Sequence, residues 1–167
     1  HRFTEEDQQR LLNGLRNLAD EEGAGLMITA SRRTPPALTY GLASLAKAGR
    51  HLYWTGTEPN PLGLYLAKAD AIVATADSTN MIGEAVATGK PVHVFHPGGG
   101  HAKISRFLGS LQRLDALHPF PGPLKTTTYE PIDATPVIAD RILADYAAFR
   151  RQQGQVAWQQ APGALTG

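Results

Sequence analysis

The stretch from Asp70 to Phe95, DAIVATADSTNMIGEAVATGKPVHVF, constrains the fold more than any other part of the chain. It holds a short apolar run, a Ser/Thr/Asn turn, a helical pattern closed by Gly89 and a second apolar run. This order predicts a parallel βαβ unit. The turn that opens such a helix exposes backbone N–H groups without intrahelical partners, and the helix dipole adds partial positive charge there. An anion such as a diphosphate is therefore the first ligand to consider.

The rest of the chain repeats this alternation of apolar runs and helical patterns. We predict strands at 26–30, 51–54, 71–75 and 92–95, an edge strand near 125–129, and helices at 4–22, 36–48, 62–69, 78–88, 101–114 and 135–152. Short apolar strands joined by helices are typical of a parallel sheet that is buried on both faces. The predicted fold class is therefore α/β, as one Rossmann-like three-layer domain over residues 1–152 with a weakly ordered tail over 153–167.

Composition narrows the possible partners. Sixteen basic and fifteen acidic side chains leave a formal net charge of +1, so no broad positive field favours nucleic acid. The absence of cysteine excludes disulfides, thiolate chemistry and cysteine-ligated zinc, and the histidines lack metal-ligand spacing, so no metal site is predicted. No apolar run approaches the ~20 residues that cross a bilayer. A cytoplasmic protein without a membrane span is therefore expected.

Three polar loops follow predicted strands, at 31–34, 77–80 and 97–101. Ligands of open parallel sheets bind at the carboxyl ends of the strands. We therefore predict that the three loops converge in space and form one binding site. The sequence contains no P-loop, no GxGxxG after the first strand and no GxSxG elbow, so the common nucleotidase, dinucleotide and serine hydrolase sites are not expected.

Each loop has a chemical interpretation and a plainer alternative. The guanidinium forks of Arg32 and Arg33 match phosphate oxygens, but both could be solvated in a surface turn. The Asp77–Asn80 turn gathers donors at a positive helix end, although all four residues are also ordinary caps. The glycines at 98–100 permit close approach to a ligand or form a flexible turn, with Lys103 beyond them. Glu84 could accept two hydrogen bonds from a ribose diol, or be solvated or paired.

Aromatic residues leave a similar choice. Tyr53, Trp54 and Tyr65 could lie in the core or stack on a base. The complete set of predicted ligand-binding residues is Ser31, Arg32, Arg33, Thr34, Asp77, Ser78, Thr79, Asn80, Glu84, Gly98, Gly99, Gly100 and Lys103. None of these residues is a convincing general base, so no catalytic residue is assigned.

Three motifs carry a resemblance to a known family. TASRRTP at 29–35, NPLGLYLAKADAIVATADSTNMIGEAVATGKPVHVF at 60–95 and the GGGHAKISRF segment resemble the carboxyl-terminal half of the family named after the plant "elongate mitochondria" fission protein. Bacterial members of that family are often labelled nucleoside-diphosphate-sugar epimerases. More distantly, ADSTNMIGEAVATGKPV is similar to the donor-binding motif of GT-B glycosyltransferases and UDP-sugar 2-epimerases.

The resemblance implies a function for the motif. Ser78 and Thr79 would contact the diphosphate and Glu84 the ribose of a nucleotide-sugar, which is a substrate, with no separate cofactor. Thr79 and Asn80 replace the small glycines of the epimerase version, which favours a transferase-like donor site over an epimerase. A non-catalytic fission or scaffold protein with a vestigial pocket is the other alternative.

The resemblance also implies a partner. In the GT-B arrangement the amino-terminal half carries the acceptor site and much of the catalytic apparatus. The chain begins with His1 and enters a helical pattern almost at once, as an excised domain would. We therefore expect a donor half that needs the amino-terminal domain of the full-length protein and is inactive without it.

Overall fold

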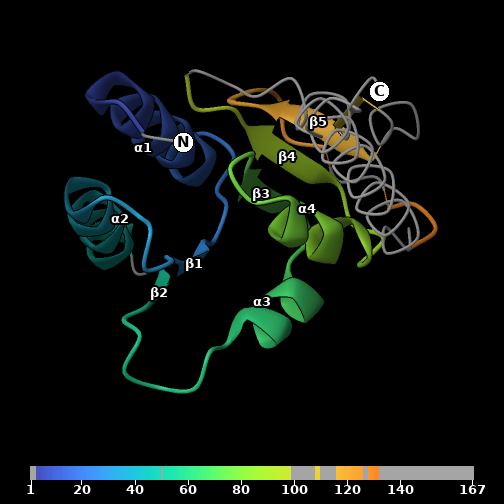
Figure 1. The fold of residues 1–167 in the computed structure, drawn as a ribbon, viewed down its shortest axis with the longest axis horizontal. Coiled ribbons are helices and arrows are strands. Elements are labelled where there is room, and N and C mark those ends of the chain that lie inside the picture. The colour runs from blue at the N-terminus through green and yellow to red at the C-terminus, as the bar shows by residue number, and fades with distance from the viewer. Residues whose placement is uncertain (1–2, 50, 99–107, 110–115, 126–127, 132–167) are drawn as a thin grey trace, which may run out of the picture. The chain divides into compact units, whose positions relative to one another are not determined.

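The computed structural model describes residues 3–49, 51–98, 108–109, 116–125 and 128–131 (Figure 1). The chain divides into two compact units, His1–Ile132 and Asp133–Gly167, and all described residues belong to the first. The elements are α1 (Glu5–Asp20), β1 (Met27–Thr29), α2 (Pro36–Gly49), β2 (Leu52–Trp54), α3 (Leu62–Lys68), β3 (Ile72–Thr75), α4 (Thr79–Val86), β4 (Val92–Phe95) and β5 (Leu117–Phe120). This alternation confirms the predicted α/β class and a Rossmann-like fold.

All described strand pairs are parallel, but hydrogen bonds group the strands into two sheets where the sequence predicts one. β1 pairs with β2, so that Thr29 lies opposite Trp54. β3, β4 and β5 form the second sheet in that order, with Thr75 opposite Phe95. Apolar packing connects the two sheets, because Ile28 of β1 and Phe95 of β4 belong to one core cluster.

The core is built from helix faces packed on the strands. α1 begins with a capping box, in which the Thr4 side chain accepts from the backbone N–H of Asp7 and the Asp7 carboxylate accepts from that of Thr4. Leucines at helical spacing then face the core from α1 and α2, namely Leu11, Leu12, Leu15, Leu18, Leu38, Leu42 and Leu45. Every residue of β4 is buried, as expected for a central parallel strand.

Several predicted boundaries differ from the structure. The edge strand predicted near 125–129 is not found in its described residues, 125, 128 and 129; the strand that pairs with β4 is instead β5, which contains Pro119. Proline marks turns, yet it is tolerated in a strand that pairs on one side, as β5 does with β4 among the described residues. α4 ends at Val86 and not at Thr88, because the next N–H groups, of Thr88 and Gly89, bond to carbonyls three residues back.

Two predicted helices fall largely or wholly beyond the described residues. Only Leu108 and Gly109 of the helix at 101–114 are described, and both are helical. The helix at 135–152 and the tail at 153–167 lie outside the described residues. Among the helices that are described, none is both long enough and apolar enough to traverse a bilayer.

Candidate functional site

Two of the three predicted loops leave neighbouring strands at the same edge of a sheet. β3 and β4 are parallel and end in register at Thr75 and Phe95. The backbone N–H of Ala76 donates to the Phe95 carbonyl at 2.8 Å, which continues the pairing one step further. The turn at 77–80 and the loop that begins at His96 therefore start side by side.

The turn at 77–80 opens α4. Ser78 is the N-cap in extended backbone, and its hydroxyl accepts from the N–H of Met81 at a long 3.4 Å. Within the described residues, the backbone N–H groups of Thr79 and Asn80 have no hydrogen-bond partner. This helix end therefore retains donors that could bind an anion.

Two carboxylates flank these donors. One oxygen of Asp77, Oδ1, is buried and lacks a hydrogen-bond partner in the described part of the chain. Buried polar atoms are rarely left without a partner, so this acceptor needs an explanation. Glu84 lies further along α4 and is exposed. The opening of α4 thus combines backbone donors with acceptors suited to hydroxyl groups.

The loop at 31–34 follows β1, in the other sheet, and is closed on itself. Thr34 Oγ1 accepts from the N–H of Ser31 at 3.0 Å, and the N–H of Thr34 donates to the Ser31 carbonyl at 3.0 Å. The N–H of Arg33 donates to Ser31 Oγ at 3.1 Å. These backbone donors are used inside the turn, so an anion here would meet the two exposed arginine side chains.

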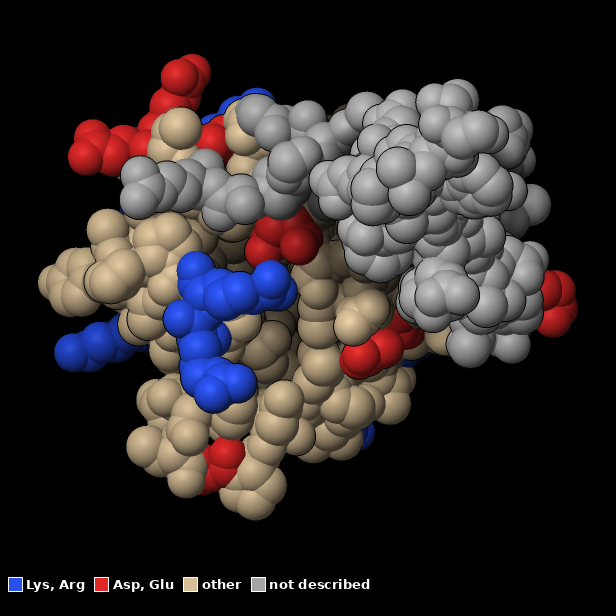
Figure 2. Space-filling view, in the orientation of Figure 1, with Lys and Arg blue, Asp and Glu red and all other residues tan. Residues whose placement is uncertain are grey.

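Basic side chains gather on one face of the molecule. Figure 2 shows a cluster of Lys and Arg over the region in which Figure 1 draws β1 and β2, with acidic side chains beside it. The chain carries a net charge of only +1, so this positive surface is local. Within the described residues, no hydrogen bond or ion pair joins the loop at 31–34 to the other two loops. Convergence of all three loops stays a prediction.

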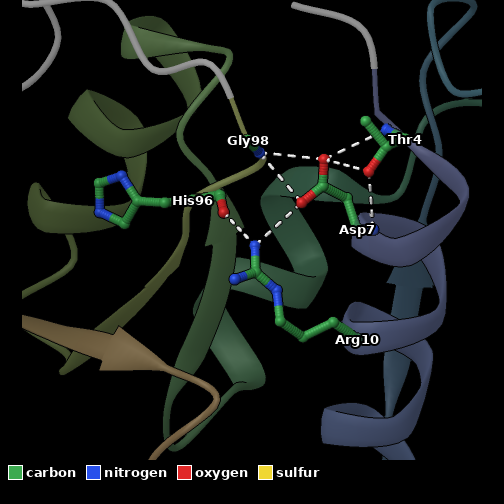
Figure 3. A network of polar contacts seen from close by, with 5 residues as sticks. All are labelled: Thr4, Asp7, Arg10, His96 and Gly98. Carbon is green, nitrogen blue, oxygen red and sulfur yellow. Dashed lines mark hydrogen bonds and ion pairs between the residues drawn. The ribbon is translucent and has the colours of Figure 1, made fainter.

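The loop after β4 is held by the start of α1 (Figure 3). Both carboxylate oxygens of Asp7 accept from the backbone N–H of Gly98, each at 3.0 Å. Arg10 donates to Asp7 Oδ1 at 3.0 Å and also to the carbonyl of His96. The Arg10 guanidinium lies 4.7 Å from the centre of the Phe95 ring. Asp7 and Arg10 thus fix the point at which this loop leaves the sheet.

Asp7 is a residue of this region that the sequence did not predict. Its only signal was the Thr4–Asp7 spacing, which indicates a helix cap and says nothing about a contact across the chain. Burial by itself raises the pKa of Asp7, but the hydrogen bonds from Gly98 and Thr4, together with the charge of Arg10, outweigh it and hold the pKa below 3.8. Partial desolvation of the ring, and then the Arg10 charge, lower the pKa of His96.

The rest of the glycine loop is not described. Gly98 is exposed, but its N–H group, the donor expected to bind a ligand, donates to Asp7. Gly99, Gly100 and Lys103, which the sequence also predicts to bind, lie outside the described residues.

A buried histidine lies in β4, next to a second histidine in β5. His93 is 1% exposed, its Nε2 accepts from the N–H of Lys125 at 3.2 Å, and its ring lies 5.3 Å from that of His118. Burial lowers the pKa of His93, so the ring is neutral. The described part of the chain contains no cluster of His, Cys, Asp or Glu that could hold a metal ion.

Comparison with known proteins places the chain in a family. The family model described as "Mitochondrial fission ELM1" matches residues 1–146. The chain belongs to the mitochondrial fission ELM1 family. It is 35% identical over 146 residues to "Mitochondrial fission protein ELM1" of Arabidopsis thaliana, which covers 84% of this chain and 34% of the plant protein. This confirms the resemblance found in the sequence.

A second relative is bacterial. An uncharacterized protein of Rickettsia prowazekii is 32% identical over 96 residues, which are 55% of this chain and 27% of that protein. This ELM1-family chain thus spans about a third or less of the length of either relative. No solved structure matches it.

Proposed function

We propose that this ELM1-family chain binds the diphosphate of a nucleotide, in particular of a nucleotide-sugar, as the donor-binding half of a GT-B-like glycosyltransferase. The observation that carries the proposal is the opening of α4. There, the N–H groups of Thr79 and Asn80, which have no partner among the described residues, lie at the edge that β3 shares with β4. Backbone donors at a positive helix end are a recurrent binding site for phosphate groups.

The neighbouring side chains fit the other parts of such a ligand. Thr79 and Ser78 add hydroxyl groups for the phosphate oxygens. Glu84 is exposed on the same helix, where it can accept from both hydroxyls of a ribose. The buried oxygen of Asp77, which has no partner among the described residues, is an acceptor for a sugar hydroxyl. Arg32 and Arg33 add positive charge from the loop after β1.

In the full-length protein the proposed reaction is glycosyl transfer. An acceptor oxygen attacks the anomeric carbon of the donor sugar, the bond from that carbon to the phosphate oxygen breaks, and the nucleoside diphosphate leaves. The N-terminus of α4 would stabilise the negative charge that develops on the departing diphosphate. The acceptor and its general base would come from the remainder of the longer protein, which is the proposed partner of this chain.

Calorimetric titration of the full-length protein with UDP, GDP and ADP tests the proposal. We expect saturable binding of at least one nucleotide, weakened about 5- to 100-fold in Glu84→Ala and in Arg32→Ala, because each removes a hydrogen bond to a charged or polar ligand group. Glu130→Ala is the control for Glu84, since Glu130 follows Tyr129, which pairs with Gly89 at the opposite end of β4. Arg16→Ala, on the exposed side of α1, is the control for Arg32.

The same titration separates the competing functions. Absence of heat with every nucleotide would overturn the donor site and favour the non-catalytic fission or scaffold protein. An epimerase would convert a UDP-sugar without any acceptor. Lack of turnover in that simpler assay, with binding intact, would favour transfer over epimerisation.

A further inference from the structure

We infer that Trp54 is the stacking platform for the base of the bound nucleotide. This inference rests on the proposed function, because it assigns the base-binding part of the same ligand site. It depends on where the β1–β2 sheet places the indole ring and on what lies next to it.

Trp54 lies on a face of the sheet that α1 and α2 do not cover. Tyr53 packs against the core cluster formed with these helices. Because successive side chains of a strand alternate between faces, Leu52 and Trp54 point to the opposite side. Leu52 is 55% exposed, so that side is open at β2. Trp54 itself is half-buried and is not part of the core cluster.

The ring is also held in place at the end of its strand. Trp54 is the last residue of β2, and its Nε1–H donates to the carbonyl of Glu58 at 2.9 Å, in the loop that follows the strand. This bond ties the indole to the carboxyl end of β2. A ring whose orientation is fixed in advance loses less entropy when a flat ligand stacks on it.

Positive charge lies beside the platform. Trp54 is in register with Thr29, the last residue of β1, and the loop with Arg32 and Arg33 begins two residues later. The carboxyl ends of adjacent parallel strands therefore bring an aromatic ring and two exposed guanidinium groups to the same edge. Phosphate needs only the cations, whereas an aromatic ring adds affinity for a planar base. This combination favours a nucleotide over an inorganic phosphate.

Titrating the full-length protein with ADP, UDP and inorganic diphosphate tests the inference. Loss of base stacking corresponds to about a 5- to 100-fold loss of affinity. We therefore expect Trp54→Leu to weaken both nucleotides by that factor and to leave inorganic diphosphate unchanged, while Trp54→Phe retains most of the nucleotide affinity. Leu52→Ala, at the other end of β2 and on the same face, is the control and should change neither affinity.

Three outcomes would overturn the inference. In the first, Trp54→Leu binds nucleotides with unchanged affinity. In the second, Trp54→Leu loses as much affinity for inorganic diphosphate as for nucleotides. In the third, the wild-type protein binds diphosphate no more weakly than nucleotides. In all three, diphosphate or nucleotide still binds, so the proposed function survives. If the wild-type protein binds neither diphosphate nor any of ADP, UDP and GDP, the proposed function fails and this inference fails with it.

A second measurement covers the case in which Trp54→Leu does not fold. Stacking on the indole should quench the tryptophan fluorescence of the wild-type protein with ADP and UDP, but not with inorganic diphosphate. In the conservative variant Trp54→Phe, nucleotides should no longer quench the fluorescence, although calorimetry should still detect their binding. Quenching that persists in Trp54→Phe would place the base elsewhere.

Discussion

At the scale of single residues, Gly89 shows why a turn glycine is required. Its φ of +73° lies in the left-handed region that side chains disfavour, and a Cβ here would lie 2.6 Å from the Tyr129 carbonyl oxygen. The carbonyl oxygen of Gly89 accepts a hydrogen bond from the N–H of Tyr129 at 2.8 Å, so the backbone has little freedom to move away. Conformation and space therefore both exclude a side chain.

A pair of variants separates these two effects. Gly23 also has a positive φ, +65°, but a Cβ there would meet nothing within 4 Å. We expect Gly23→Ala to lower the free energy of unfolding by about 1–2 kcal/mol, the cost of the left-handed conformation alone. Gly89→Ala should cost more, because the clash with Tyr129 adds to it. Urea denaturation measures both, and equal losses would contradict the role of the close contact.

Some residue contacts in the site could be predicted from the sequence, and others could not. Ser78 as the N-cap of α4 follows from local chemistry, because a hydroxyl beside a helix start caps its free N–H groups. The pairing of Asp7 with Gly98 does not, because it joins residues far apart in the chain. The contacts of Arg32 and Arg33 depend on tertiary placement in the same way.

At the scale of elements, the start of α1 serves two purposes at once. The Asp7 carboxylate completes the capping box and holds the N–H of Gly98 after β4. A helix cap needs only one such oxygen, so the second contact docks the whole helix end against the sheet edge. The leucines of α1 pack in the hydrophobic core and hold the rest of the helix in place.

Asp7→Asn tests this docking. The substitution keeps the shape of the side chain but removes a charge that accepts from Gly98, Thr4 and Arg10. We expect the free energy of unfolding to fall by about 1–3 kcal/mol, the cost of weakening hydrogen bonds to a buried charged group. Asp20→Asn, an exposed acid at the other end of α1, should be neutral or slightly stabilising, because it removes a negative charge from the negative end of the helix dipole.

Amide hydrogen exchange distinguishes docking from simple capping. If Asp7 holds the loop, the Gly98 amide should exchange faster in Asp7→Asn than in the wild-type protein. In Thr4→Ala, which disrupts only the cap, it should exchange at the wild-type rate. Equal protection of Gly98 in all variants would refute the docking role.

Elements were predictable to the extent that their signals are local. β1 to β4 and α1 to α4 follow from apolar runs, caps and closing glycines, and each was placed within a few residues. β5 was misplaced because Leu117–Phe120 is short and includes a proline, so only its pairing with β4 defines it as a strand. The division of the strands into two sheets could not be predicted either, because it depends on which strands lie next to one another in the folded chain.

At the scale of the whole molecule, two buried groups make stability depend on pH in the same direction. His93 is neutral in the folded protein because burial lowers its pKa below 6.5. Below pH 6.5 this histidine binds a proton in the unfolded chain but not in the folded protein, so acid favours unfolding. Asp7 has a folded pKa below 3.8, so the unfolded chain is again protonated first, below that pH.

We therefore predict that the free energy of unfolding is level between pH 8 and 6.5, declines as pH falls below 6.5, and declines further below 3.8. Each group contributes a slope of at most about 1.4 kcal/mol per pH unit, the value for one proton. Denaturant titrations from pH 8 to pH 3 measure the profile. His93→Gln, which retains a hydrogen-bond acceptor for Lys125, should flatten the first decline, and Asp7→Asn the second. A first decline of unchanged slope in His93→Gln would show that other groups dominate the response to acid. The core histidine of β4 would then have no part in setting the pH range over which this domain stays folded.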